Sequence, residues 1–209
     1  TMWLLPRMPD FWQKHPEIAV DHLISDNAKD YRRAEVDLRI RYGFGAWLDE
    51  TAELLFDDVI FPVCGPGFLA AHPAASAEEL AGLPLLHVDW VDPDWAGWDE
   101  FMTRAKVSRG AGRGRRFGKF AVALQAAMAD QGVALGWGRL VSEHLASGRL
   151  VRITDLVLPA PGAYYVTWNA NRLLSPAAQV LLDWLRQKAA EERHARLGDS
   201  LFRDLSTPA

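Results

Sequence analysis

Hydrophobic positions along the chain recur with two different periods, and the alternation between these periods predicts interleaved strands and helices. Residues 18–24 and 38–42 alternate apolar and polar side chains, which is typical of half-buried strands. The polar stretch NAKDYRRAE between them has helical character. The first part of the chain is therefore predicted to form a strand, a helix and a second strand.

The rest of the chain continues this alternation. Further strands are predicted for LLFDDVIFPVC, PLLHVDW, VALGW, LVRITD and AYYVTWNA, and further helices for SAEELAG, DPDWAGWDEFMTRAKV, KFAVALQAAM and RLVSEHLASG. Ser76 with Glu79 three residues later forms a capping box, and Ser175 followed by Pro176 predicts the start of a long final helix. Strands and helices in this order predict an α/β fold with mostly parallel sheets.

Both ends of the chain carry helical patterns. The stretch TMWLLPRMPDFW places five apolar side chains on one helical face: Leu4, Leu5, Met8, Phe11 and Trp12. Pro9 is expected to interrupt that helix after one turn. The tail RQKAAEERHARLGDSLFRDLSTPA is expected to be a helix with a frayed, partly apolar end that packs on a neighbouring subunit.

Composition narrows the class of protein. The 209 residues are 49% hydrophobic with a formal net charge of −4, which favours a globular protein and argues against a surface that binds nucleic acid by itself. No run approaches the ~20 apolar residues that span a bilayer, and the first residues show no charged segment that leads into an apolar signal core, so we expect a chain that is not exported. Cys64 is the only cysteine, so a disulfide framework is excluded. We expect Cys64 to be a small side chain within a strand.

Searches for catalytic, cofactor and metal motifs find none, so we expect no cofactor, no metal and no enzymatic activity. His87 and Asp89 would share one face of a strand, where a hydrogen-bonded or surface histidine is the alternative to an acid–base or metal role. A run of basic residues suggests either a solvated loop or a nucleic-acid contact. Its members are Arg109, Arg113, Arg115, Arg116 and Lys119.

Several segments, in order along nearly the whole chain, resemble the effector-binding domain of LysR-type transcriptional regulators. The resemblance is to the subgroup that includes the glycine-cleavage and β-lactamase regulators. The segments that carry it are TMWLLPRMPDFWQKHPEIAV, VDLRIRYGFGAW, IFPVCGPGFL, PLLHVDWVDPDWAGW, LQAAMADQGVAL and LASGRLV.

The resemblance implies an α/β fold of two Rossmann-like lobes joined by two crossover strands, as in type 2 periplasmic binding proteins. Lobe I would hold residues 1–61 and 165–209, and lobe II residues 62–164. A small-molecule effector would bind in the cleft between the lobes and change the geometry of a homodimer or tetramer in the cytoplasm. DNA would be bound by an N-terminal winged helix-turn-helix, which is absent from this sequence, as is the first strand of lobe I; we therefore expect the chain to be a piece of a longer protein.

The resemblance also implies which residues face the effector. They are Thr1, Ser25, Asp30, Tyr42, Gly43, Phe120, Ala121 and Tyr164. Relatives usually carry a small or hydroxyl residue where this chain has Phe120, so a bulky ring there favours an apolar or aromatic effector, while Lys119 favours an anionic one. Simpler roles stay open for four of these residues: a helix cap for Thr1, a solvated helix position for Asp30, and packing in the core or at an interface for Tyr42 and Tyr164.

Two other functional classes remain open at this point. An exported solute-binding protein would share the bilobal shape, but it would need a secretion signal. An enzyme on the same fold would need a nucleophile or cofactor attachment point, and Cys64 is the residue to test for that role. The effector, the operator and the direction of regulation do not follow from the sequence.

Overall fold

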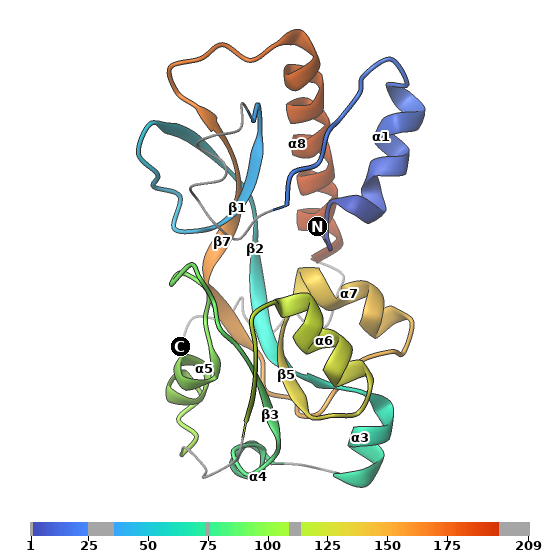
Figure 1. Cartoon of the computed structure of the whole chain (residues 1–209), viewed down its shortest axis with the longest axis vertical. Coiled ribbons are helices and arrows are strands. Elements are labelled where there is room, and N and C mark those ends of the chain that lie inside the picture. The colour runs from blue at the N-terminus through green and yellow to red at the C-terminus, as the bar shows by residue number, and fades with distance from the viewer. Residues whose placement is uncertain (1, 25–35, 74–75, 109–113, 197–209) are drawn as a thin grey trace. The chain divides into compact units, whose positions relative to one another are not determined.

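The computed structural model describes residues 2–24, 36–73, 76–108 and 114–196 (Figure 1). The chain divides into two compact units, one formed by Thr1–Asp57 with Pro161–Ala209 and the other by Asp58–Ala160. We refer to them as unit 1 and unit 2. Strands β2 (Glu50–Cys64) and β7 (Leu158–Asn169) each run from one unit into the other. The lobe boundaries expected from the sequence, at 61/62 and 164/165, stay a prediction.

Unit 1 combines a sheet with helices from both ends of the chain. A short 3₁₀ turn (Leu5–Arg7) leads into α1 (Met8–Lys14), and β1 (Arg39–Gly43) pairs antiparallel with β7. The last element of the unit is the long helix α8 (Pro176–Arg196). At the start of α8, the Ser175 hydroxyl accepts a hydrogen bond from the Ala178 N–H (3.1 Å). The predicted cap and first helical proline of this helix are therefore confirmed.

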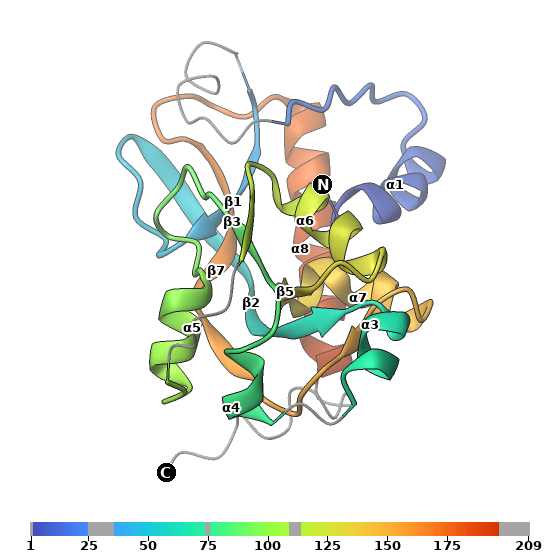
Figure 2. The ribbon, with the colours of Figure 1, turned by 60° about the horizontal axis from the view of Figure 1, so that its bottom comes forward.

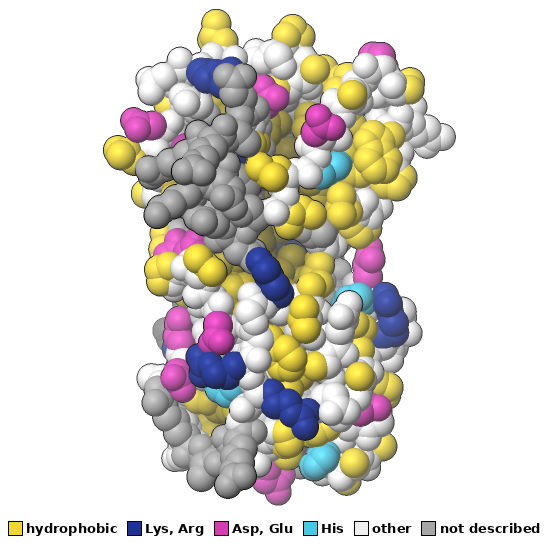
Figure 3. Space-filling model, in the orientation of Figure 1, with side chains coloured by type: hydrophobic (Ala, Val, Ile, Leu, Met, Phe, Trp, Pro, Cys, Tyr) yellow, Lys and Arg dark blue, Asp and Glu magenta, His cyan; other side chains and the backbone are white. Residues whose placement is uncertain are grey.

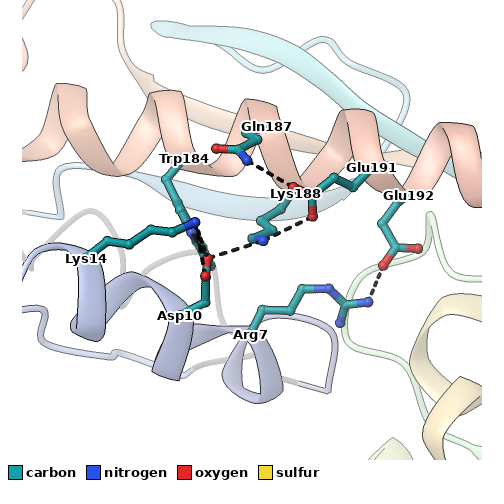
Figure 4. A network of polar contacts seen from close by, with 8 residues as sticks. All are labelled: Arg7, Asp10, Lys14, Trp184, Gln187, Lys188, Glu191 and Glu192. Atoms are coloured by element: carbon teal, nitrogen blue, oxygen red, sulfur yellow. Dashed lines mark hydrogen bonds and ion pairs between the residues drawn. The ribbon is translucent and has the colours of Figure 1, made fainter.

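Helices α1 and α8 are held together by a buried ring contact and by a network of polar contacts; Figure 4 shows the polar network. Phe11 packs edge-on against Trp184, with ring centroids 5.3 Å apart. The Trp184 indole N–H donates to Asp10 Oδ2 (2.8 Å), and Lys188 Nζ lies 3.2 Å from the same oxygen. Arg7 forms an ion pair with Glu192. Pro9 does not break α1, because it lies in the first turn of the helix, where its missing N–H costs nothing.

Unit 2 contains a sheet in which β2, β5 (Val133–Trp137), β3 (Leu85–Val88) and β4 (Arg115–Phe117) lie in that order. Strand β6 (Val151–Arg152) also pairs with β2 but lies outside this strand order. The helices are α3 (Pro66–Ala71), α4 (Ala77–Leu80), α5 (Trp98–Arg104), α6 (Phe120–Met128) and α7 (Gly138–Ala146). In both ribbon views α5 and α6 lie on opposite sides of β3, so the sheet is covered on both faces (Figures 1 and 2).

The core of unit 2 explains why β5 consists only of apolar residues and glycine. All five residues of this strand are buried, as expected for a central strand of a sheet that is covered on both faces. Gly132 leads into it with φ +151°, and a Cβ atom there would lie 2.3 Å from the Pro84 carbonyl oxygen. Only glycine allows this approach, which sets the register of β5 against β3.

Two sequence predictions about strands are wrong. Residues 18–24 form no strand, and Leu23 and Ile24 are 49% and 64% exposed. Alternating apolar and polar residues determine which face of a strand would be buried, but a strand also needs a neighbouring strand to pair with. The sheet is not mostly parallel either. Strand β3 pairs in parallel with β4 and β5, whereas β2 pairs antiparallel with β5 and β6 and β1 with β7, because β2 and β7 cross between units instead of belonging to βαβ repeats.

Other predictions are confirmed or lie outside the described residues. The Ser76 capping box is present, with reciprocal bonds to Glu79 of 3.2 and 2.7 Å. The predicted helix over 92–107 is shorter, because α5 begins only at Trp98. The predicted helix in NAKDYRRAE and the tail beyond residue 196 lie outside the described residues.

The contact between α1 and α8 predicts an acid-sensitive stability. The Trp184 hydrogen bond and the neighbouring lysines hold the pKa of Asp10 well below its usual range. Because the native pKa is depressed, the carboxylate stabilises the fold above the unfolded-state pKa, and this stabilisation is lost as the pH falls through about 5 to 2. Melting temperatures of wild type and Asp10→Asn should therefore differ at pH 7 and converge toward pH 2.

Asp21→Asn is the matched control, since Asp21 is an exposed carboxylate of the same unit. It should keep the pH profile of the wild type. Parallel profiles for all three proteins would contradict the role assigned to Asp10.

Candidate functional site

The topology of unit 2 brings three chain segments to one edge of its sheet. Strands β3, β4 and β5 run parallel, so their carboxyl ends lie at the same edge. The chain leaves β3 toward Trp90, leaves β4 toward the start of α6 at Phe120, and leaves β5 at Trp137. In open α/β sheets this edge is where ligands bind.

Helix α6 begins at this edge without a polar cap. Its N-cap residue, Lys119, has an extended backbone (φ −141°, ψ 133°) and makes no side-chain capping bond, and the first turn holds no acidic residue. Phe120 is half-buried and Ala121 is exposed. The start of the helix therefore presents backbone N–H groups and the positive end of the helix dipole, which suits an anion or a hydrogen-bond acceptor.

Helix α7 follows α6 after a single strand, β5, and its start is bound by a carboxylate from β2. Asp58 of β2 is 2% exposed and accepts hydrogen bonds from the Val59 N–H (2.8 Å) and the Arg139 N–H (3.0 Å). Gly138 makes this approach possible, because a Cβ atom there would lie 3.1 Å from Asp58 Oδ1. The positive end of α7 is thus already occupied by a protein side chain.

The other described α-helices also have an acceptor or an acid at their start. Helix α3 has Asp130, which accepts from the Phe68 N–H (2.8 Å), while α4 has Ser76 and α8 has Ser175. Helices α1 and α5 carry acidic residues in their first turns. Among the described α-helices, α6 alone has neither a described acceptor nor a first-turn acid, which makes its start the candidate place for an external acceptor.

Four aromatic rings gather next to the start of α6. This aromatic cluster consists of Trp90, Trp95, Phe120 and Trp137. Trp90 stacks on Trp95 (4.6 Å, 13°), and Phe120 contacts Trp90 and Trp137 with centroids 5.7 Å apart in each case. Trp137 is 1% exposed and supports the other three rings, which are only half-buried. The space-filling view shows hydrophobic side chains gathered around α6 with Lys and Arg beside them (Figure 3).

Sequence reasoning did not find this cluster as a site. The helix predicted over 92–107 would include Trp95 together with Trp98, Phe101 and Met102, yet of these four only Trp98, Phe101 and Met102 are buried in the core. Trp95 instead precedes α5 and turns toward Trp90. The available signal was the position of Trp90 and Trp137 as the last residues of the predicted strands PLLHVDW and VALGW, where side chains lie at the sheet edge.

Unit 1 holds the other predicted site residues in a second aromatic group. Tyr42 of β1 and Tyr164 of β7 face each other across the antiparallel pair, with ring centroids 5.3 Å apart. The Tyr42 hydroxyl accepts a hydrogen bond from the Gly162 N–H (2.8 Å). Gly43 follows in β1, and a Cβ atom on Gly162 would lie 2.6 Å from its carbonyl oxygen, so the two strands approach closely here.

The eight predicted site residues are therefore distributed in three ways. Tyr42, Gly43 and Tyr164 lie together in unit 1. Phe120 and Ala121 lie together at the start of α6 in unit 2. Thr1, Ser25 and Asp30 lie outside the described residues. Their role in binding an effector stays a prediction.

The remaining candidate chemistry has structural explanations. Asp89 pairs with Arg116, and burial together with Arg116 lowers the pKa of His87. Arg115 donates to Gln131. Burial raises the pKa of Cys64 to about 11, which favours the protonated thiol at neutral pH and disfavours a nucleophilic role.

Across the described ranges, no three His, Cys, Asp or Glu side chains gather in a way that would hold a metal ion. Within the same ranges, no helix is both long enough and apolar enough to cross a membrane.

Two α/β units connected by two shared strands, with an uncapped helix start and aromatic rings at a sheet edge, define a ligand-binding module rather than a catalytic centre. Comparison with known proteins agrees with this class. Residues 1–190 match the model of the LysR substrate binding domain. The chain belongs to this family, and its fold is the periplasmic-binding-protein-like α/β fold expected from the sequence.

The relatives are regulators of transcription. The chain is 31% identical over 192 residues to the glycine cleavage system transcriptional activator of Escherichia coli K12, covering 91% of this chain and 62% of that protein. It is 29% identical to the transcriptional activator AmpR of Rhodobacter capsulatus, covering 90% and 63%. This chain thus spans less than two thirds of the length of these relatives, and the prediction that it is no enzyme is confirmed by their class.

Solved structures give the same answer for the fold. The effector domain of AmpR of Pseudomonas aeruginosa superimposes with a TM-score of 0.79 at 30% identity, covering 94% of this chain and 93% of that one. The AmpR effector binding domain from Citrobacter freundii gives a TM-score of 0.76 at 26% identity, covering 90% and 92%. The chain is accordingly an effector-binding domain of a LysR-type regulator.

The Asp58 contact predicts a large effect on stability. Asp58→Ala removes the buried acceptor from the Val59 and Arg139 N–H groups and leaves both without their partner, which should cost about 2–4 kcal/mol of unfolding free energy. Urea denaturation followed by circular dichroism measures this. Asp155→Ala, at an exposed acid of the same unit, should change the midpoint little; equal effects of the two substitutions would contradict the role of Asp58 as the cap of α7.

Proposed function

We propose that this chain senses a small-molecule effector that binds at the start of α6, and that effector binding alters transcription through the regulator to which the chain belongs. The uncapped start of α6 beside the aromatic cluster is the observation that carries this proposal. The start of the helix can bind a negatively charged or hydrogen-bond-accepting group of a ligand. The adjacent rings can pack against a planar or apolar part of the same ligand.

The chemistry of the effector follows from these two features. A carboxylate or similar acceptor would bind the N–H groups of Phe120 and Ala121, with Lys119 adding positive charge next to it. An aromatic or apolar part of the effector would lie on the half-buried rings of Phe120 and Trp90. We therefore propose an effector that is anionic, aromatic or both.

Regulation requires parts of the protein beyond this chain. The net charge of −4 does not favour contacts with DNA phosphates, so we propose that DNA is bound by an N-terminal helix-turn-helix outside this sequence. The transcriptional activators to which the chain is similar support this assignment. We further propose a homo-oligomer in the cytoplasm, whose geometry changes when the favoured conformation is stabilised by the effector.

The proposal is tested first by reading the gene upstream of Thr1. We expect about 90 codons that encode a helix-turn-helix with a basic recognition helix, followed by a linker helix. A charged start with a short apolar core and a cleavage site would instead make the chain an exported solute-binding protein and overturn the proposal.

The role of Phe120 predicts a change of ligand preference. Phe120→Ser removes a ring from the aromatic cluster and adds a hydroxyl at the start of α6, so thermal shifts across a panel of aromatic and aliphatic carboxylates should move from aromatic toward small polar ligands. Val122→Ser is the matched control, because Val122 lies on the same helix and is 47% exposed. A panel profile that is the same for both variants and for wild type would rule out a site at Phe120.

A further inference from the structure

The aromatic cluster contains one half-buried ring to which the proposed function gives no role. Trp95 lies in the loop that connects β3 to α5, and it stacks on Trp90 with ring centroids 4.6 Å apart and ring planes 13° apart. Both rings are half-buried, whereas Trp98 at the start of α5 is 3% exposed and belongs to the core. The stack therefore belongs to the half-exposed sheet edge and not to the core of unit 2.

A tight turn in this loop returns the chain from Trp90 to the stack. The Trp95 N–H donates to the Asp92 carbonyl (3.4 Å), and the Asp92 side chain accepts a second hydrogen bond from the Asp94 N–H (3.0 Å). Pro93 stands at the second position of the turn, where its fixed φ is favourable. The sequence Asp-Pro-Asp thus fixes the path of the chain between the two tryptophans.

Both ends of the loop are anchored to the sheet of unit 2. At its beginning, the Asp89 N–H donates to the Phe117 carbonyl (2.9 Å) and so continues the pairing of β3 with β4. At its end, Ala96 is 1% exposed, and the Trp98 indole N–H donates to the Leu86 carbonyl (3.0 Å). A loop that is anchored at both ends and closed by a turn holds its indole in a defined position.

The stack limits the rotation of the Trp90 ring. Trp95 covers one face of this ring, and Trp137 lies edge-on to both indoles, at centroid distances of 5.4 and 5.1 Å. Trp90 also contacts Phe120 at the start of α6 (5.7 Å). A side chain that is already ordered before a ligand arrives loses less conformational freedom on binding, so the stack prepares Trp90 for a ligand.

A prepared aromatic surface favours one kind of ligand group. Aromatic pairs gain free energy beyond the area they bury, and this gain depends on the relative orientation of the two rings. A saturated group of equal size gains only from the buried area. Fixing the orientation of Trp90 consequently helps a planar aromatic ligand more than an aliphatic one.

We propose that Trp95 is a positioning residue of the effector site, which holds Trp90 in the orientation in which it packs, together with Phe120, against an aromatic ring of the effector. Trp95 acts through Trp90 and not by contact with the effector. The inference rests on the proposed function, because it concerns the same site at the start of α6, and it narrows the effector class to acids that carry an aromatic ring.

The experiment compares phenylacetate with cyclohexylacetate, which carry the same charge and have similar sizes but differ in aromaticity. Binding to the full chain is measured by isothermal titration calorimetry and by the indole N–H signal of Trp90 in ¹H–¹⁵N spectra, assigned with Trp90→Phe. We expect wild type to prefer phenylacetate, with a saturable shift of the Trp90 signal.

Trp95→Ala frees the Trp90 ring. It should weaken phenylacetate binding about fivefold, as expected for one side chain that must be ordered on binding, and weaken cyclohexylacetate binding much less. Trp95→Phe keeps a ring in the stack and should restore most of the preference. Val91→Ala is the matched control, because Val91 lies in the same loop and is 69% exposed, and it should keep both affinities.

A purely structural role for Trp95 predicts a different result, in which Trp95→Ala weakens both ligands by the same factor. That equal loss, an unchanged preference in Trp95→Ala, or a failure of Trp95→Phe to restore the preference would overturn the inference, as would a wild type that binds both ligands equally. The proposed function would survive these four results. Absence of saturable binding of either ligand to wild type would instead count against the site at the start of α6, and against this inference with it.

Discussion

Every α-helix begins with backbone N–H groups that have no partner inside the helix, and this domain depends on where the acceptors for those groups come from. Some are local, as with Ser76 and Ser175. Others come from distant strands and loops, as with Asp58 for α7 and Asp130 for α3. Because these distant acceptors tie helices to strands, they fix the layers of unit 2 as well as the helix ends. The start of α6 stands out because the described part of the protein supplies it with neither kind.

The local elements of the fold follow directly from the sequence. A capping box, a proline at the first helical position and a glycine next to a central strand act within a few residues, so they can be recognised without knowing the rest of the fold. The start of α6, the run of β5 and the first residue of α8 were therefore predictable. Gly148, with φ +68°, follows α7 closely for the same reason.

Long-range contacts account for what the sequence did not reveal. Residues 18–24 have the alternation of a strand, but a strand also needs a partner with free backbone groups. Asp58 looks like an ordinary acid next to Asp57, and only the pairing of β2 with β5 brings it to α7. The aromatic cluster likewise joins residues from three segments, since Trp90, Phe120 and Trp137 are neighbours only because their strands run parallel. The resemblance to a known family identified Phe120 but not the three tryptophans around it.

The buried position of Cys64 has a practical consequence. It is the only thiol in the sequence, it ends β2 in the core, and its raised pKa keeps it protonated. A maleimide or iodoacetamide reagent therefore finds almost no thiolate to react with in the native protein. Cysteines introduced at exposed positions such as Phe44 or Leu173 can be labelled with fluorophores or spin labels without first removing the natural one. Distances between labels at two such introduced cysteines can therefore be measured in solution while Cys64 stays in place.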